Sequence, residues 1–409
     1  MALRFLTLDD FDLEGKTVFL RVDVNSPIDP SSNAILDDSR IKATKETLSS
    51  LKNSKVVLGS HQSRPGKEDF TTLEEHTNLL RRYCSQDVAF VEDVMGPTAR
   101  KAIRELRRGQ VLVLDNLRTC SEEVLDGPSE KLAKTLMIQR LAPLCNLYVN
   151  DAFAAAHRSQ ASLVGFAYVL PSAAGRLMEK ELRALNLVLW EPKRPCTYVL
   201  GGAKVEDKLP VVENIVKAGK SDTVLLGGLM AKIFLRAMGF DLSRGDEEEL
   251  AGLIQYVQRA KVILDKYQNK ITVPVDLATL KDNKRVEAPV KELHHDKPSL
   301  DIGSDTVREY ANTIKQSKTV VANGPMGIFE KEGFDFGTKT VLEAIASCKG
   351  TTVIGGGHLA GLASMLGIED SFSHVSTAGG AMLSMLAGES LPGVEALVQA
   401  AERYRRQSA

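Results

Sequence analysis

Short apolar runs rich in β-branched residues alternate with longer segments of helical spacing along the whole chain. This alternation is typical of parallel strands joined by crossover helices. The pattern therefore predicts an α/β fold with two sheets, one in each half of the chain. The predicted strands are residues 17–24, 55–60, 110–116 and 146–151 in the first half, and 197–202, 222–228, 270–276, 318–324 and 351–357 in the second.

The segments between these runs carry helix signals. Residues 40–51 predict one helix with a cap at Asp38 or Ser39, and residues 175–195 predict a longer helix that ends in prolines. We therefore expect two doubly wound, mainly parallel-sheet, Rossmann-like domains joined by a hinge helix. The expected parts are an N-terminal domain (1–174), the interdomain helix (175–195), a C-terminal domain (196–388) and a helical tail (389–409) that packs back near the hinge or the N-terminal domain.

Composition narrows the class of protein. A chain of 409 residues is too long for one core, which agrees with two domains. The net charge of -1 argues against nucleic acid as a partner. The five cysteines show no CxxC spacing, so neither a disulfide framework nor a thiolate metal site is indicated. The longest apolar stretch, 163–170, is far shorter than the ~20 residues that span a bilayer, so we expect a cytoplasmic protein without membrane contact.

Charged and strongly hydrogen-bonding residues follow the strands of the first half. Ligands of open α/β sheets bind outside the carboxyl ends of the strands, so these are the positions where chemistry is expected. The residues are Asp23, Asn25, His61, Arg64, Asn116, Arg118, Asn150, Asp151, His157 and Arg158.

Arg40 adds a further cation, because it lies in the first turn of the predicted 40–51 helix, where it opposes the helix dipole. Four arginines and His61 at one mouth would repel one another unless a multiply charged anion neutralised them. The alternative is that each arginine pairs with a local carboxylate, or that His61 and Arg64 only keep a surface loop soluble. We interpret the whole set as a cradle for a small phosphorylated acid.

Glycines follow the strands of the second half instead, as in Gly201, Gly202, Gly227, Gly228, Gly324, Gly327, Gly355, Gly356, Gly357, Gly379 and Gly380. Residues 201–208 join a strand to a helix and place Lys204 and Lys208 one turn apart, where the pair could hold phosphate oxygens. Alternating Lys and Glu could equally just solvate a helix start. Residues 355–360 half-match a dinucleotide fingerprint, which is a weak signal, and no P-loop motif is present.

Eight ordered motifs resemble those of the phosphoglycerate kinase family and cover nearly the whole chain. They are RVDVN (21–25), GSHQSRP (59–65), DNLR (115–118), DAFAAAHR (151–158), GGAKVEDK (201–208), NGPMGIFE (323–330), GGGH (355–358) and SHVSTAGGA (373–381). The resemblance implies a two-domain hinge enzyme that moves a phosphoryl group between 1,3-bisphosphoglycerate and ADP, giving 3-phosphoglycerate and ATP. It implies no nucleic-acid or membrane partner, and either a monomer or a homodimer.

The resemblance also implies roles for single residues. Catalysis would involve Arg40, Lys204, Gly357 and Gly380. The phosphoglycerate would be bound by Asp23, Asn25, Arg40, His61, Arg64, Arg118 and Arg158. The nucleotide would be bound by Gly202, Ala203, Lys208, Asn323, Glu330, Gly355, Gly356, Gly357 and His358. Mg²⁺ would arrive with ADP or ATP, without a protein ligand.

Three departures from the usual family pattern stand out. His358 replaces the aspartate of the GGGD motif, and neutral imidazole is a poor ligand for a cation that prefers oxygen. Ala322 replaces a tryptophan, and Ala154 and Ala155 replace a Gly-Thr pair, which resembles the archaeal branch. Two other functions stay open: a nicotinamide-dependent oxidoreductase, and a non-catalytic protein that kept the fold.

Overall fold

The computed structural model describes residues 4–293, 296–376 and 378–408, and it forms two compact units. The first unit comprises Met1–Arg183 and Ser390–Ala409, and the second comprises Ala184–Glu389. The division falls inside helix α8 (Arg176–Trp190), within the segment predicted as a hinge. The domain limits drawn from the sequence stay a prediction. No helix among the described residues is long and apolar enough to cross a bilayer.

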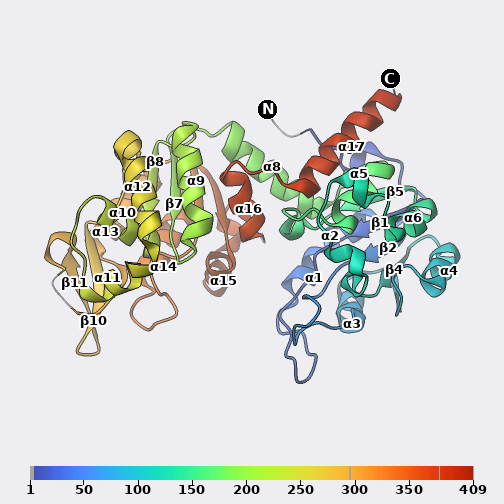
Figure 1. Cartoon of the computed structure of the whole chain (residues 1–409), viewed down its shortest axis with the longest axis horizontal. Helices are drawn as coiled ribbons and strands as arrows, with labels where there is room; N and C mark the ends of the chain where they lie inside the picture. The colour runs from blue at the N-terminus through green and yellow to red at the C-terminus, as the bar shows by residue number, and fades with distance from the viewer. Residues whose placement is uncertain (1–3, 294–295, 377, 409) are drawn as a thin grey trace. The chain divides into compact units, whose positions relative to one another are not determined.

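The first unit is built on a six-stranded parallel sheet (Figure 1). Its strands, in spatial order, are β3 (Asp87–Val91), β4 (Gln110–Leu114), β2 (Lys55–Gly59), β1 (Thr17–Arg21), β5 (Leu147–Asn150) and β6 (Ser172–Ala174). Its helices are α1 (Ser39–Ala43), α2 (Lys45–Ser50), α3 (Glu74–Tyr83), α4 (Pro97–Glu105), α5 (Ser129–Leu132), α6 (Leu136–Leu141), α7 (Phe166–Val169) and α17 (Pro392–Ser408). Sequence analysis missed β3 and β6, and it extended the other strands by one to three residues.

Helices cover both faces of this sheet because apolar side chains alternate along each strand. On β1, Val18 and Leu20 pack in one core with Ile41 of α1, whereas Phe19 packs in the opposite core with Ile103 of α4. Phe19 also stacks on Phe166, with ring centroids 4.0 Å apart. The predicted 40–51 helix is interrupted at Thr44, which separates α1 from α2.

The C-terminal helix α17, red in Figure 1, lies against the first unit. It contacts α7 and β6, and the amide of Gly393 donates to the carbonyl of Ala156 at 2.9 Å. Arg403 donates to the carbonyl of Ala167. The end of the chain is therefore part of the same compact unit as its beginning.

The second unit repeats the plan with another six-stranded parallel sheet and adds a small antiparallel one. The parallel strands, in spatial order, are β15 (His374–Ser376), β14 (Thr351–Gly355), β13 (Thr319–Asn323), β7 (Cys196–Leu200), β8 (Thr223–Leu226) and β9 (Ile271–Thr272). The helices are α9 (Val205–Lys217), α10 (Gly228–Ala237), α11 (Arg244–Leu250), α12 (Ile254–Tyr267), α13 (Ser304–Gln316), α14 (Phe336–Ala346), α15 (Gly357–Met365) and α16 (Gly379–Leu386). The predicted α/β class with two mainly parallel sheets is confirmed.

The antiparallel sheet has the order β11 (Lys284–Pro289), β10 (Asp276–Lys281) and β12 (Ser299–Ile302). Sequence analysis missed it and treated residues 270–276 as one strand, which the structure divides between β9 and β10. The turn between β10 and β11 consists of Asp282 and Asn283, both at positive φ (49° and 57°). A two-residue turn of this kind is a hairpin signal that the sequence did contain.

Replacing Phe19 tests the double core of the first unit. Phe19→Ala should lower the free energy of unfolding by ~3–5 kcal/mol, because it empties a fully buried site that stacks on Phe166. Leu36→Ala is the matched control, since Leu36 is 69% exposed and its loss should cost less than about 0.5 kcal/mol. Calorimetric unfolding of both variants measures the difference, and equal losses would contradict this account of the core.

Candidate functional site

Each parallel sheet reverses its strand order at one point. In the first sheet the chain moves from β1 to β2 on one side and later returns to place β5 on the other. In the second sheet, β8 and β13 lie on opposite sides of β7 in the same way. Open α/β folds bind ligands outside the carboxyl ends of the strands at such a reversal. Each unit therefore has one expected ligand position.

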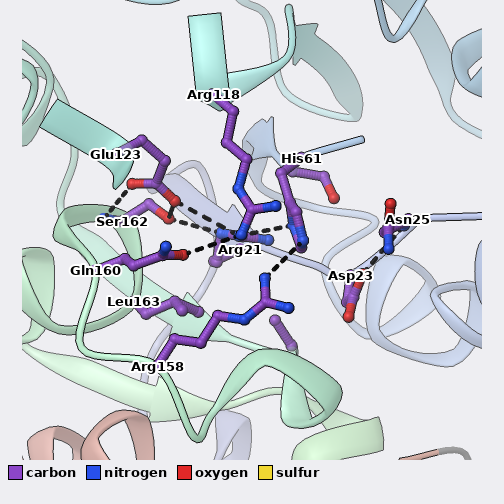
Figure 2. Close-up of polar contacts among 12 residues, drawn as sticks. Arg21, Asp23, Asn25, His61, Arg118, Glu123, Arg158, Gln160, Ser162 and Leu163 are labelled. Atoms are coloured by element: carbon purple, nitrogen blue, oxygen red, sulfur yellow. Dashed lines mark hydrogen bonds and ion pairs between the residues drawn. The ribbon is translucent and has the colours of Figure 1, made fainter. Parts of the chain in front are cut away.

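Basic side chains meet at this position in the first unit. We call Arg21, Asp23, Asn25, Arg40, His61, Arg118 and Arg158 the basic cluster. His61 lies at its centre and is buried (Figure 2). Its Nδ1 lies 3.2 Å from a terminal nitrogen of Arg21, and its Nε2 lies 3.2 Å from a terminal nitrogen of Arg158. Loops after β2 and β5 thus meet the last residue of β1.

Arg118 is buried in the basic cluster and is only partly satisfied. It follows β4, where the Asn116 side chain accepts a hydrogen bond from its backbone amide at 3.1 Å. Its guanidinium donates to the carbonyl of Ser63 and lies 3.5 Å from Gln160 Oε1, while its buried Nε has no hydrogen-bond partner in the described part of the chain. Burial, with the nearby charges of Arg158 and Arg21, lowers the pKa of Arg118 to about 10.

Asp23 and Arg40 form the other side of the basic cluster. Arg40 on α1 donates to Asp23 Oδ2 at 2.9 Å, and the Asn25 side chain accepts from the amide of Ser63 at 2.8 Å. Burial raises the pKa of Asp23, but the guanidinium groups of Arg40 and Arg21 and the hydrogen bond from the Asn25 amide oppose this effect, and the pKa lies below its ordinary value. Asp23 is therefore ionised and offsets one cation.

Positive charge remains in excess around His61. In the described part of the chain, the carboxylates in contact with the guanidinium groups are those of Asp23 and Glu123. The guanidinium groups are those of Arg21, Arg40, Arg118 and Arg158, joined by the exposed Arg64, whose charge also lowers the pKa of Arg118 and Arg158. An anion with several negative charges would satisfy both this excess and the unpaired Arg118 Nε.

Three polar residues at strand ends serve the scaffold instead. The Asn116 amide donates to the carbonyls of Gln62 and Thr71 at 2.9 and 2.8 Å, which ties two loops together. Asp151 accepts from the amide of Met178 at 3.1 Å at the start of α8, and burial raises its pKa to about 6. Asn150 accepts from the amide of Ala152 at 3.0 Å.

The second unit places a buried lysine between two glycines after β7 and β13. We call Gly202, Lys208, Asn323, Gly324, Gly356 and Gly379 the glycine cluster. Gly202 and Gly324 have φ of 81° and 84°, and a Cβ on either would come within 3.0 or 2.7 Å of Lys208 Nζ. Burial lowers the pKa of Lys208 to about 8, with Asp207 opposing and Lys204 adding to the effect. The buried ammonium group of Lys208 is thus flanked by glycine backbone without side chains, an arrangement that suits an anion.

Asn323 extends the glycine cluster toward two helix N-termini. Its buried Nδ2 has no hydrogen-bond partner among the described residues. The same atom would lie 3.3 Å from a Cβ on Gly356, which precedes α15, and 3.9 Å from one on Gly379, which begins α16. Helix N-termini present free amides, so they and Asn323 offer several donors to one anion.

Several predicted nucleotide residues are less enclosed. Lys204 and Ala203 are exposed, and Lys204 is the N-cap of α9 rather than a residue on its face, so it and Lys208 differ in environment. The side chains of Glu330 and His358 are more than half exposed, and Glu330 Oε1 lies 3.9 Å from His358 Nε2. Beside Gly357 and Gly380 an added Cβ would meet nothing within 4 Å, so space over both is open.

Metal ligation by the protein itself has no support in the described ranges. No group of three or more His, Cys, Asp or Glu residues there could hold a metal ion.

Four residues that contact the basic cluster or belong to it were not among the predicted site residues: Arg21, Glu123, Gln160 and Ser162. One signal was available, because Arg21 ends an otherwise apolar strand, and a buried arginine needs a partner. The other three lie in segments without a regular pattern, so only the tertiary structure could identify them.

Comparison with known proteins decides the family. The family model described as phosphoglycerate kinase matches residues 8–389. The chain belongs to the phosphoglycerate kinase family. It is therefore an enzyme of the phosphotransferase class.

The similar proteins match this chain over nearly their full length. The chain is 46% identical to a phosphoglycerate kinase of Methanobacterium bryantii over 99% of this chain and 100% of the relative. The crystal structure of phosphoglycerate kinase from Pyrococcus horikoshii OT3 is similar with a TM-score of 0.89 and 44% identity, over 97% of this chain and 99% of that one. A structure of phosphoglycerate kinase from Coxiella burnetii is also similar, with a TM-score of 0.80, 30% identity and coverage of 97% of this chain and 100% of that one. The higher identities to the proteins of Methanobacterium bryantii and Pyrococcus horikoshii agree with the resemblance to the archaeal branch.

Two buried lysines of the second unit, Lys208 and Lys232, allow a comparison of a buried ammonium group without an ion pair among the residues that the structure describes and one with an ion pair. Lys208→Met should raise the free energy of unfolding at pH 7 by on the order of 1–3 kcal/mol, because it removes a buried cation whose pKa is depressed to about 8. Lys232 is equally buried but pairs with Asp246 at 2.7 Å, so Lys232→Met should destabilise by ~3–5 kcal/mol.

The sign of the pH dependence follows from the depressed pKa. Between about pH 8 and the ordinary lysine pKa of 10.5, the unfolded chain holds the proton that folded Lys208 has lost. The stability of the wild type should therefore rise toward that of Lys208→Met across this window. Calorimetry at several pH values measures the gap, and a Lys208→Met protein less stable than wild type at pH 7 would contradict the prediction.

Proposed function

We propose that the chain catalyses reversible phosphoryl transfer from 1,3-bisphosphoglycerate to ADP, giving 3-phosphoglycerate and ATP. The assignment rests on family membership together with the two clusters. The basic cluster, with its excess positive charge, lies where the strand order of the first sheet reverses, and the glycine cluster lies where that of the second sheet reverses. The reaction belongs to glycolysis and gluconeogenesis.

The basic cluster is assigned to the phosphoglycerate. A sugar acid phosphate carries several negative charges. Arg118, Arg158 and the exposed Arg64 supply cations that form no ion pair with a carboxylate among the described residues, although the charges of Glu123 and Asp23 act on Arg118 and Arg158. Asp23 and Asn25 supply acceptors that suit the hydroxyl group of the same molecule. His61 adds a ring nitrogen between Arg21 and Arg158.

The glycine cluster is assigned to the nucleotide phosphates. Lys208 Nζ, Asn323 Nδ2 and the amides that begin α15 and α16 are the donors, and Gly202, Gly355 and Gly356 let the backbone approach closely. Glu330 and His358 lie at an exposed rim, where Glu330 would receive the ribose hydroxyls. Mg²⁺ carried with the nucleotide would supply neutralising charge at its phosphates, and no protein side chain is assigned to it.

The proposed chemistry is an in-line transfer with little covalent work by the protein. A carboxylate or phosphate oxygen is already the nucleophile, so no general base is required. Arg40 and Lys204 are assigned to the transferring phosphoryl group, where cations stabilise its equatorial oxygens. The two substrates must meet, and closure of the two domains around the hinge segment would exclude water from the acyl phosphate. Gly357 and Gly380 would present backbone amides to the same group.

Loss of either proposed catalytic cation tests the transfer. Arg40→Ala and Lys204→Ala should each lower turnover by about 10²–10³-fold, because each removes a charge that stabilises the transition state. Ground-state binding of both substrates should change less. The control is Lys16→Ala, since Lys16 is exposed and precedes β1, at the amino edge of the sheet.

A coupled assay of ATP formation from ADP and 1,3-bisphosphoglycerate measures these variants. Wild-type turnover with no effect of either substitution would reject the roles of Arg40 and Lys204 while keeping the reaction. A wild-type protein that binds Mg-ADP without turnover would identify a non-catalytic protein, and binding of NADH would favour an oxidoreductase.

Two helical glycines test the approach of phosphate to the backbone. Gly380→Ala should leave stability unchanged or raise it by ~0.4–1 kcal/mol, because nothing lies within 4 Å of the added Cβ and the residue is helical. The same methyl should block a phosphoryl group and lower kcat/KM by about tenfold or more. Gly361→Ala in α15 is the control, since its Cβ also meets nothing. Full activity of Gly380→Ala would remove Gly380 from the site.

A further inference from the structure

His61 is held between two groups that can only donate hydrogen bonds. Arg21 approaches Nδ1 and Arg158 approaches Nε2, each at 3.2 Å. A neutral imidazole has one acceptor nitrogen and one N–H, and a guanidinium has no acceptor. Only one of the two contacts can therefore be a hydrogen bond, and the other sets an N–H against a cation.

The Arg21 contact is the better fixed of the two (Figure 2). Arg21 has no exposed surface, its Nε donates to Ser162 Oγ at 2.7 Å, and it also donates to the carbonyl of Val22. Arg158 is only half-buried, and among the described residues its other hydrogen bond joins it to the exposed His157. Arg158 can therefore turn away from His61, whereas Arg21 cannot.

Glu123 and Ser162 hold Arg21 in place. Glu123 is fully buried, and its two oxygens accept from the amide and the hydroxyl of Ser162 at 2.9 and 2.5 Å. The Ser162 hydroxyl has one proton, which it donates to Glu123, so its oxygen is free to accept from Arg21 Nε. Glu123 also lies 3.6 Å from a terminal nitrogen of Arg21. The direction of every hydrogen bond in this chain of contacts is thus determined.

We propose that Glu123 and Ser162 are positioning residues that act through Arg21 to hold His61 in the tautomer with its proton on Nε2. The neutral ring then donates its Nε2–H to the bound anion, beside Arg158. The proposal rests on the assignment of the basic cluster to the phosphoglycerate. Neither Glu123 nor Ser162 contacts the anion itself.

The neutral imidazole of His61 can donate a hydrogen bond without adding positive charge to the basic cluster. The groups that face it are Arg21, Arg118, Arg158 and Asp23. Burial lowers the pKa of His61 well below its ordinary value, Asp23 opposes the shift, and the three guanidinium groups add to it. A charged imidazole would add to the repulsion among these cations, whereas Nε2–H adds a hydrogen bond without adding charge. When the anion arrives, Arg158 and Nε2–H both turn to it and no longer oppose each other.

Histidine ¹⁵N NMR of the full chain tests the tautomer directly. His61 is identified by the signals that disappear in His61→Asn. In the wild type at neutral pH, Nε2 should carry the proton and Nδ1 should be unprotonated. A His61 protonated on Nδ1, or on both nitrogens, would overturn the proposal.

Two variants test whether Glu123 and Ser162 set this state. In Glu123→Gln the new amide cannot accept from both Ser162 groups, and Ser162→Ala removes the link to Arg21, so both should show a fraction of Nδ1-protonated His61. Both should raise KM for 3-phosphoglycerate in proportion to that fraction, by up to about tenfold, the value of one hydrogen bond to a charged group, and change kcat and KM for ATP by less than about twofold. An unchanged tautomer in both variants would overturn the proposal. Ser162→Ala keeps the test available if Glu123→Gln does not fold.

Ser54→Ala is the matched control for loss of a buried hydroxyl. Ser54 is fully buried in the same unit, and its hydroxyl donates to the carbonyl of Leu13 at 2.8 Å, before the amino end of β2. It should alter neither the tautomer nor KM, and an effect equal to that of Ser162→Ala would mean that general loosening explains both. If His61 has the expected tautomer but its signals ignore added 3-phosphoglycerate, donation to the substrate is wrong, and so is the assignment of the basic cluster. Failure of the tautomer proposal can therefore be distinguished from failure of the assignment of the basic cluster to the phosphoglycerate.

Discussion

Uncompensated positive charge at the carboxyl edge of the first sheet is the constraint on which the rest of the first unit depends. Burial removes the solvent that would screen guanidinium groups, so their mutual repulsion is costly. Burial, with the charges of neighbouring arginines as a smaller cause, lowers the pKa values of Arg118 and Arg158. The fold tolerates this repulsion because rigid strands hold the loops in place and because Asp23 and Glu123 each neutralise part of the charge. The remainder is available to an anion.

The second unit solves a related problem with backbone rather than with guanidinium groups. Lys208 is its buried charge, and Asn323 and the N-termini of α15 and α16 complete the donor set. Glycines at 202, 324, 356 and 379 matter here because any side chain would occupy the space beside Lys208 or Asn323. In the proposed nucleotide site, the backbone amides of this donor set cannot be lost through a change of side-chain conformation.

The two kinds of site suit two kinds of ligand. A small acid presents few atoms, so it is recognised by charged side chains that can each reach a different oxygen. A nucleotide presents a long phosphate chain, which a row of backbone amides can follow. Within the basic cluster, His61 shows that the inner contacts also determine where protons lie, since the fixed donor Arg21 faces one side of its ring.

The sequence by itself determined the α/β class, the two parallel sheets and the family, because strand periodicity and ordered motifs are local properties of the chain. It also named most members of both clusters, since a residue after a parallel strand must lie at the carboxyl edge of its sheet. Only the tertiary structure showed which of these side chains the scaffold holds: Asn116 and Asp151 bind backbone groups, whereas Lys204 stands exposed at the N-cap position of α9. Glu123 and Ser162 entered the site only through folding, because contacts between segments far apart in sequence leave no local pattern.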